Sequence, residues 1–378
     1  MASYLISTPI GGGSFNITND NSSWCHLDGN RFLIVFGQQN PNHWYAQVVT
    51  YNGPTTPPTT GEARIIWQNM AVRPSYVRAL AFDGGNSVLV LYGVGNGANS
   101  AIHQQWLTID PLTDEISEGS VMRVALAVTP GTSASASFKA VKLSETRLRL
   151  SYNDSSTSNY LCTPTVEIGG AIEIGSTTNY TGAGFLTAWS PVPNTTDMIE
   201  WLSLGSSNLI ALRVLDNAGE VVTDISGTLG SGAAPSAQRI AASAGRAFIS
   251  LSNGVNLQTI TSNALNQPIQ TGGGTISGGL DIFCALDDNH VLGIRTGPVA
   301  QSTAYARVFR ILSDGVAEVS APTSMEGGLP LNMGTLDGIK GWYNTSNRYH
   351  EGLHSYDVNT KILWFTTNNQ IGYKVLKV

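Results

Sequence analysis

The sequence predicts an all-β protein that forms a single β-propeller domain over residues 1–378, with seven blades as the favoured number and six as the alternative. Two observations lead to this fold class: a composition that is poor in charge and rich in glycine, and an internal repeat. Only 12% of the 378 residues are charged, and 41 are glycine. About a quarter of the residues are charged in an average soluble domain. So few charged side chains disfavour long solvent-exposed helices and favour strands joined by turns.

The internal repeat is a short pattern in which an apolar residue is followed by turn residues and then by a polar or basic residue that opens an apolar strand. It occurs seven times, at residues 27–31 (LDGNR), 82–86 (FDGGN), 143–147 (LSETR), 204–208 (LGSSN), 242–246 (ASAGR), 286–290 (LDDNH) and 336–340 (LDGIK). The copies are separated by about 50 residues on average, which is the length of one four-stranded propeller blade. Seven copies therefore predict seven blades.

Further turns follow most copies of this pattern, at residues 109–113, 215–219, 312–315 and 356–360. Each of them places Asp, Asn or Gly where a hairpin needs a residue that tolerates positive φ or bonds its own backbone. Carboxylates such as Asp110, Asp114 and Asp287 are therefore expected to serve their turns.

The fourth repeat is the weakest, because the apolar run Leu209–Leu215 contains no turn and this repeat could lack a strand. That is the reason for keeping six blades as an alternative. The terminal segments 4–6 and 373–376 also look like strands outside a full repeat. We expect them to pair in one blade and to close the ring. A β-sandwich is the rival architecture, but no linker divides the chain into two such domains.

Charge and hydropathy exclude two classes of partner. The chain has 20 Lys and Arg against 26 Asp and Glu, with a net charge of −6 and no basic cluster, so we expect no nucleic-acid partner. No apolar run is long enough to span a bilayer, and the N-terminal residues show no secretory signal. The three cysteines, Cys25, Cys162 and Cys284, lie too far apart for a disulfide framework or a metal knuckle and are expected to be buried thiols.

Catalytic and metal-binding motifs are weak in this sequence. Residues 350–354 (HEGLH) match the H-E-x-x-H pattern of zinc hydrolases, but they include Gly352 and run into a predicted hairpin. On a strand, two His side chains four residues apart lie about 13 Å from each other, too far for one tetrahedral zinc ion. We therefore expect no metal, no cofactor and no enzymatic activity. A glycosidase or a zinc hydrolase remains the least favoured alternative, since the spacing of two carboxylates cannot be read from a sequence.

Aromatic side chains near strand ends or in loops suggest a contact surface, because an aromatic face with a few polar groups suits a sugar. The candidate binding residues are His43, Trp44, Tyr45, Tyr160, Trp189, Trp342 and Tyr343. Tryptophans do not recur at one blade position, so the sequence predicts a single surface rather than one pocket per blade. Trp106, Trp201 and Trp364 lie within apolar strands and are expected in the core.

In its signal-free, weakly charged composition and its irregular repeats between Leu27 and Trp364, the chain resembles the β-propeller proteins of tailed-phage virions, which occur as tail nozzles, hubs and knobs. The resemblance is one of architecture and composition and transfers no functional residue. It implies a non-catalytic structural or adhesive protein, assembled in the host cytoplasm and placed in the virion. Its expected partners are other virion proteins or copies of itself, and a glycan of the host surface. The alternative is a carbohydrate-binding propeller lectin.

Overall fold

The computed structural model describes strands along most of the chain and many of the turns between them. The described residues are 12–16, 22–38, 43–53, 56, 58–68, 74–94, 101–126, 139–154, 160–162, 165–168, 179–180, 186–191, 197–204, 209–216, 218–228, 239–243, 246–251, 256–263, 267–275, 282–285, 290–296, 304–312, 315–318, 323–324, 353–355, 360–367 and 370–377. Side chains are described, with gaps, chiefly between residues 23 and 122, 140 and 168, and 197 and 221. Within this part of the chain, no helix is long and apolar enough to cross a membrane.

The described strands form seven antiparallel sheets, which we number from sheet 1 to sheet 7 along the chain. Sheet 1 contains β2 (Ser22–Asp28), β3 (Arg31–Gln38), β4 (His43–Thr50), β5 (Thr59–Thr60) and β6 (Arg64–Trp67). Sheet 2 contains β7 (Pro74–Phe82), β8 (Ser87–Val94), β9 (Ala101–Ile109), β10 (Ile116–Glu118) and β11 (Met122–Leu126). Sheet 3 contains β12 (Lys139–Ser144), β13 (Arg147–Asp154), β14 (Tyr160–Cys162), β15 (Thr165–Glu167) and β16 (Asn179–Tyr180).

The remaining strands make up four further sheets. Sheet 4 contains β17 (Leu186–Pro191), β18 (Met198–Leu204), β19 (Leu209–Leu215) and β20 (Val221–Thr228). Sheet 5 contains β21 (Arg239–Ser243), β22 (Arg246–Leu251), β23 (Asn256–Asn263) and β24 (Gln267–Thr275). Sheet 6 contains β25 (Ile282–Ala285), β26 (His290–Thr296), β27 (Ala304–Leu312), β28 (Gly315–Glu318) and β29 (Thr323–Ser324). Sheet 7 contains β1 (Gly12–Asn16), β30 (Leu353–Ser355), β31 (Thr360–Thr367) and β32 (Gln370–Lys377).

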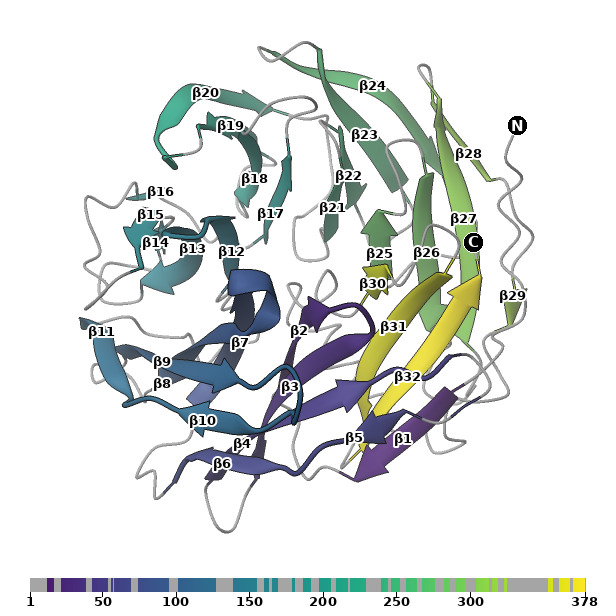
Figure 1. Cartoon of the computed structure of the whole chain (residues 1–378). Coiled ribbons are helices and arrows are strands. Elements are labelled where there is room, and N and C mark those ends of the chain that lie inside the picture. The colour runs from purple at the N-terminus through teal and green to yellow at the C-terminus, as the bar shows by residue number, and fades with distance from the viewer. Residues whose placement is uncertain are drawn as a thin grey trace.

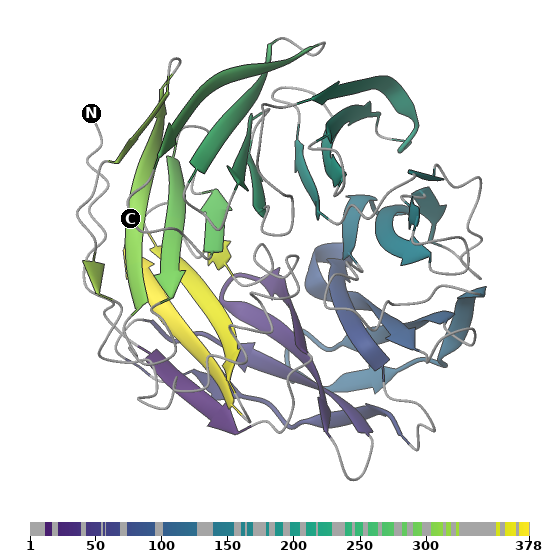
Figure 2. The same ribbon diagram turned by 180° about the vertical axis from the view of Figure 1, so that it is seen from behind.

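The sheets follow one another around a common centre (Figures 1 and 2). In sheets 1 to 6 the first strand along the chain lies nearest to that centre, whereas in sheet 7 the inner strand is β30 and β1 is the outer strand. Adjacent sheets meet through these inner strands, as where β2 contacts β7 and β17 contacts β21. This arrangement differs from the two stacked layers of a β-sandwich. The prediction of an all-β, propeller-like fold is therefore confirmed.

Strands from the two ends of the sequence pair in sheet 7, where β1 is antiparallel to β32 with Gly12 opposite Lys374 and Asn16 opposite Gln370. Closure by terminal strands was predicted, but with residues 4–6, which lie outside the described residues. Residues 12–16 take this position instead.

Five copies of the repeated pattern lie in the sequence between the first and second strands of their sheets: residues 27–31, 82–86, 143–147, 242–246 and 286–290. The turn at 82–86 contains the short 3₁₀ helix η1 (Asp83–Gly85). The fourth copy instead joins the second and third strands of sheet 4. That sheet has four strands, because β17 precedes the copy, so the expectation of a missing strand is wrong. The seventh copy lies outside the described residues.

Strand β8 shows why neighbouring sheets pack together. Its side chains alternate between two faces, as in any strand. Val88, Val90 and Tyr92 belong to the core between sheets 1 and 2, whereas Leu89 and Leu91 belong to the core between sheets 2 and 3. All five are fully buried. A strand apolar on both faces can be covered only by a sheet on each side, which a circular arrangement supplies.

Charged side chains also join neighbouring sheets. Arg31, at the end of the first repeated pattern, donates to Asp114 and to the carbonyl of Asp110 in the β9–β10 turn of sheet 2. Arg147 occupies the same position in sheet 3 and donates to the carbonyl of Ala218 in the β19–β20 turn of sheet 4. The basic residue of the pattern therefore reaches the outer turn of the next sheet in both pairs.

A buried ionic cluster connects sheets 3 and 4. Arg149 donates from Nε and Nη2 to the two carboxylate oxygens of Glu200, each at 2.9 Å. Arg213, opposite Glu200 on the adjacent strand, lies 3.6 Å from the same carboxylate. These three side chains are 5%, 0% and 1% exposed for Arg149, Glu200 and Arg213. Such a carboxylate is costly to remove, because two buried cations would then face each other.

We therefore expect Glu200→Gln to lower the free energy of unfolding by about 3 kcal/mol, the size typical of breaking a buried ion pair. Chemical denaturation measures this loss. Glu220→Gln, at an exposed residue of the β19–β20 turn, is the matched control and should change stability by less than about 0.5 kcal/mol. Equal stability of the Glu200→Gln and Glu220→Gln variants would contradict the role assigned to this cluster.

Candidate functional site

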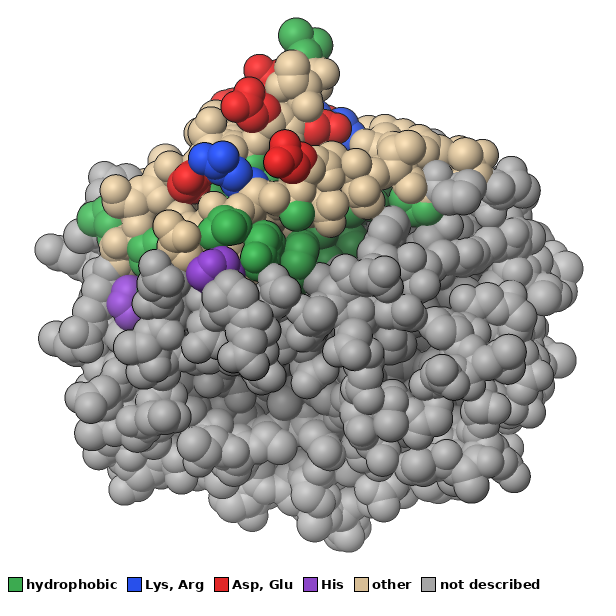
Figure 3. Space-filling model, turned by 90° about the horizontal axis from the view of Figure 1, so that it is seen from below, with side chains coloured by type: hydrophobic (Ala, Val, Ile, Leu, Met, Phe, Trp, Pro, Cys, Tyr) green, Lys and Arg blue, Asp and Glu red, His purple; other side chains and the backbone are tan. Residues whose placement is uncertain are grey.

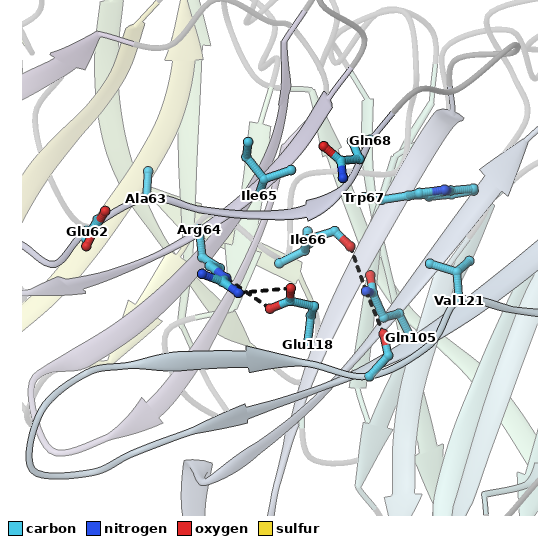
Figure 4. A pocket seen from close by; sticks show the side chains of 11 residues that line it. Glu62, Ala63, Arg64, Ile65, Ile66, Trp67, Gln68, Gln105, Glu118 and Val121 are labelled. Carbon is cyan, nitrogen blue, oxygen red and sulfur yellow. Dashed lines mark hydrogen bonds and ion pairs between the residues drawn. The ribbon is translucent and has the colours of Figure 1, made fainter.

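The described part of the molecule contains an open groove of about 520 Å³ between sheets 1 and 2. It is lined by residues 62–68, which comprise β6 and its flanks, by Gln105 of β9, and by Glu118, Gly119 and Val121 around the end of β10 (Figure 4). On the face seen in Figure 3, charged side chains of both signs lie beside exposed hydrophobic side chains. The lining of the groove itself combines charged and hydrophobic side chains, so the groove offers polar and apolar contacts within one concave site.

Gln105 forms the floor of this groove and joins the two sheets. Its Nε2 donates to the carbonyl of Ile66 in sheet 1 at 2.7 Å and to the carbonyl of Gly119 in sheet 2 at 2.9 Å. Its Oε1 accepts from the hydroxyl of Tyr92 at 2.8 Å. The side chain is 1% exposed. The amide thus uses both of its donor hydrogens and one acceptor site in a buried position, and its orientation is fixed.

Tyr92 supports this arrangement from the core. Complete burial raises the pKa of its hydroxyl well above the usual value of 10.0. The hydroxyl therefore stays protonated and donates to Gln105. The Tyr92 ring also contacts the rings of Trp44 and Trp67 edge-on, with centroid separations of 5.7 and 4.8 Å.

Strand β6 carries the residues that face the groove, and its pairing with β4 is irregular. Trp44 is opposite Trp67 and Tyr45 is opposite Ile65, so Ile66 is an extra residue in the register. Such a bulge re-aims the following side chains. It allows Arg64 and Trp67, which would face opposite sides of a regular strand, both to line the groove.

Trp67 supplies the aromatic surface of the site. Its ring is partly exposed, and its position is fixed by Tyr92 and by His103, whose ring centroid lies 5.4 Å away. Figure 4 shows the ring extending toward Val121, with the Gln105 amide below it. An aromatic ring held in place beside fixed amide and charged groups suits a ligand that has an apolar face and polar edges.

Arg64 and Glu118 form an ion pair across the groove, from β6 to β10. Arg64 donates from Nε to Oε2 at 3.0 Å and from Nη2 to Oε1 at 3.1 Å. This hydrogen bond lowers the pKa of Glu118 below the usual value of 4.5, although partial burial opposes it. It also raises the pKa of Arg64. Both groups are therefore charged at neutral pH, and Glu118 is an acceptor rather than a proton donor.

Among the residues predicted to form a contact surface, His43 and Tyr45 lie on one face of β4 with ring centroids 6.3 Å apart, and Trp44 does not join them. Trp44 is 1% exposed and belongs to the core between sheets 1 and 2. Its neighbours His43 and Tyr45 point to the other face of β4, where Tyr45 stacks on Phe36 at 5.5 Å. Tyr160 and Trp189 lie in β14 and β17, in different sheets, without described side chains. Trp342 and Tyr343 lie outside the described residues.

Trp67 is the residue that the sequence analysis missed as a binding candidate. It lies at the end of an apolar run that reads as an ordinary strand, and in the structure it lines the groove next to the register shift at Ile66. A signal was present in Arg64 and Gln68, polar residues that flank this run at both ends.

The carboxylates predicted to serve turns do so where they are described. Asp110 accepts from the backbone N–H groups of Leu112 and Thr113 at 2.8 and 3.0 Å, and these bonds lower its pKa. Asp114 has a positive φ of 60° and bonds Arg31. Asp287 lies outside the described residues, as do His350 and Glu351 of the zinc-like motif, while His354 lies in strand β30. No group of three potential metal ligands occurs among the residues that the structure describes.

Comparisons with known proteins identify fold relatives but no family. No protein-family model matches the chain, and no curated protein matches it. A solved structure from Bacteroides uniformis, assigned as a 6-phosphogluconolactonase, superposes with a TM-score of 0.52 at 10% identity over 89% of this chain and 91% of that chain. A prolyl endopeptidase superposes with a TM-score of 0.51 at 12% identity over 95% of this chain and 46% of that chain, so more than half of that enzyme has no counterpart here. An α-L-arabinofuranosidase from Fusarium graminearum gives a TM-score of 0.47 at 11% identity over 80% of this chain and 98% of that chain.

These structures contradict the prediction that the chain is not an enzyme, because its propeller-like fold is shared with a lactonase and an endopeptidase. The prediction relied on missing local motifs. Active sites on such a fold can be assembled from side chains that are far apart in the sequence, so missing motifs do not exclude catalysis. The phage resemblance, with its partners and virion location, is tested neither by the comparisons nor by the described residues and stays a prediction.

The role of Gln105 leads to a prediction about stability. Gln105→Leu keeps the volume similar but leaves the carbonyls of Ile66 and Gly119 and the hydroxyl of Tyr92 without this amide. We expect a loss of about 3 kcal/mol in the free energy of unfolding and a changed fluorescence of Trp67. The control Gln68→Leu, at an exposed side chain, should unfold like the wild type. Wild-type stability of Gln105→Leu would rule out a joining role for this amide.

The ion pair leads to a prediction about titration. In an NMR pH titration, the pKa of Glu118 should fall below 4.5, and Arg64→Gln should raise it, because the stabilising hydrogen bond is lost. Since the folded-state pKa is depressed, this bond contributes stability above pH 4.5, and the contribution disappears as the pH falls through the lower folded value. An unchanged pKa in Arg64→Gln would show that the pair does not persist in solution.

Proposed function

We propose that this chain is a carbohydrate-binding β-propeller of seven blades closed into a ring, and that it binds its ligand in the groove between sheets 1 and 2. The observation that carries the proposal is the partly exposed ring of Trp67, held beside a fixed amide and a cross-groove ion pair. Sugars present apolar C–H faces and hydroxyl edges, and this combination of groups matches both.

The site's rigidity supports this proposal. Gln105, Tyr92 and Trp67 are each held by contacts to both neighbouring sheets, so binding costs little ordering of side chains. The volume of about 520 Å³ lies within the range of small-molecule sites.

The seven-bladed ring is supported by the seven described sheets and by the pairing of β1 with β32. In this ring each blade is covered on both faces by its neighbours, which positions β6 against β9 and β10 and so forms the groove.

The function is tested by binding of the full-length chain to a glycan array and by intrinsic fluorescence titration with each retained glycan. Trp67→Ala should weaken binding at least about fivefold, since one stacking aromatic contributes about 1 kcal/mol or more. Trp67→Phe should keep part of the affinity, because it retains an aromatic face. Binding that is unaffected by Trp67→Ala would place the ligand elsewhere, and a chain that retains no glycan would refute the proposal.

A further inference from the structure

The Arg64–Glu118 ion pair has hydrogen-bonding capacity left over for a ligand. A guanidinium has five N–H donors, and the pair uses two of them, on Nε and Nη2. Each carboxylate oxygen of Glu118 accepts one of these bonds, and the residue's own backbone N–H donates a third, so one of the four lone pairs of the carboxylate is left for a ligand. The side chains are 57% and 33% exposed for Arg64 and Glu118. The pair therefore presents donors and acceptors side by side to whatever occupies the groove.

This combination matches adjacent hydroxyl groups. A hydroxyl is both a donor and an acceptor, so one hydroxyl of a vicinal diol can accept from Arg64 while its neighbour donates to Glu118. A carboxylate or a sulfate has only acceptors at neutral pH. It could bond Arg64 but would be repelled by Glu118.

The charge of the groove adds to this discrimination. Its lining holds two carboxylates, on Glu62 and Glu118, against the one cation Arg64. The guanidinium is already engaged by Glu118 in a two-point contact, the geometry that an anionic ligand would otherwise take. An anionic sugar would have to displace that carboxylate.

The length of the site sets the size of the ligand. Arg64 and Trp67 are three residues apart on β6, which corresponds to about 10 Å along a strand. A ligand of two linked rings is long enough to stack one ring on the indole and to reach the ion pair with the other.

We propose that the groove selects neutral oligosaccharides of at least two units, one ring stacking on Trp67 while a vicinal diol of another bridges Arg64 and Glu118. This inference rests on the proposed carbohydrate-binding function and adds the class of ligand. Arg64 and Glu118 are then the residues that determine specificity.

The test compares cellotetraose, maltotetraose and mannotetraose with the anionic tetragalacturonate in calorimetric titrations of the full-length chain. The wild type should bind at least one neutral probe about tenfold or more tightly than tetragalacturonate. Glu118→Gln removes the repulsion of anions and frees the guanidinium of Arg64. It should therefore weaken binding of the neutral probe and strengthen binding of tetragalacturonate, so that the preference for the neutral probe is reversed or lost. Glu115→Gln, at an exposed residue of the adjacent turn, is the matched control and should keep the wild-type ratio.

The reversed pair Arg64→Glu with Glu118→Arg keeps donors and acceptors together and should restore binding of the neutral probe relative to Glu118→Gln. Circular dichroism verifies that each variant is folded. The inference is overturned if the wild type binds tetragalacturonate as tightly as every neutral probe, or if Glu118→Gln leaves the ratio unchanged. If Trp67→Ala weakens binding but Glu118→Gln leaves the ratio of the neutral-probe affinity to the tetragalacturonate affinity unchanged, only the proposed ligand class is wrong. If no probe and no arrayed glycan binds, the proposed function fails as well.

Discussion

The site depends on one buried amide, that of Gln105, which holds the edge of sheet 1 against sheet 2. Backbone carbonyls that are removed from water need a hydrogen-bond donor, and Gln105 supplies one to Ile66 and one to Gly119. Tyr92 fixes the amide from below, and its ring in turn supports Trp67. The Gln105 amide therefore determines the distance between the two sheets, the floor of the groove and the position of its aromatic ring.

The groove arises where the repeat symmetry is broken. In sheet 1, Gln47 donates to the carbonyl of Gly61, and in sheet 2 the corresponding Gln105 donates to the carbonyl of Gly119. Among the contacts of the described residues, the second glutamine also reaches the neighbouring sheet, at the carbonyl of the bulged residue Ile66 of β6. A conserved architectural contact would serve every sheet in the same way. A corresponding bulge occurs in sheet 2, where β11 pairs with β9 and the register shifts between Arg123 and Ala125. Among the described contacts it is therefore the additional bond of Gln105 that distinguishes the junction holding Trp67 and the cross-groove ion pair.

Local chemistry made much of the fold predictable from the sequence. Asp110 and Asp216 bond the backbone of their own turns, and so the turns at 109–113 and 215–219 could be recognised. Pairing between distant segments was harder to predict from the sequence: residues 4–6 were expected to pair with the C-terminal strand, and the described strand that pairs with β32 is formed by residues 12–16. The site was missed because the opposite faces of β4 separate Trp44 from Tyr45, and because a register shift, which leaves no mark in composition, brings Trp67 to the groove.

The most direct measurement is a crystal structure of the full-length chain soaked with a neutral oligosaccharide that the chain binds in solution. The account predicts a sugar ring against the indole of Trp67, with hydroxyl groups of a second ring within hydrogen-bond distance of Arg64 and Glu118. A ligand bound at the centre of the ring of sheets, or on another face with Trp67 uncovered, would contradict it.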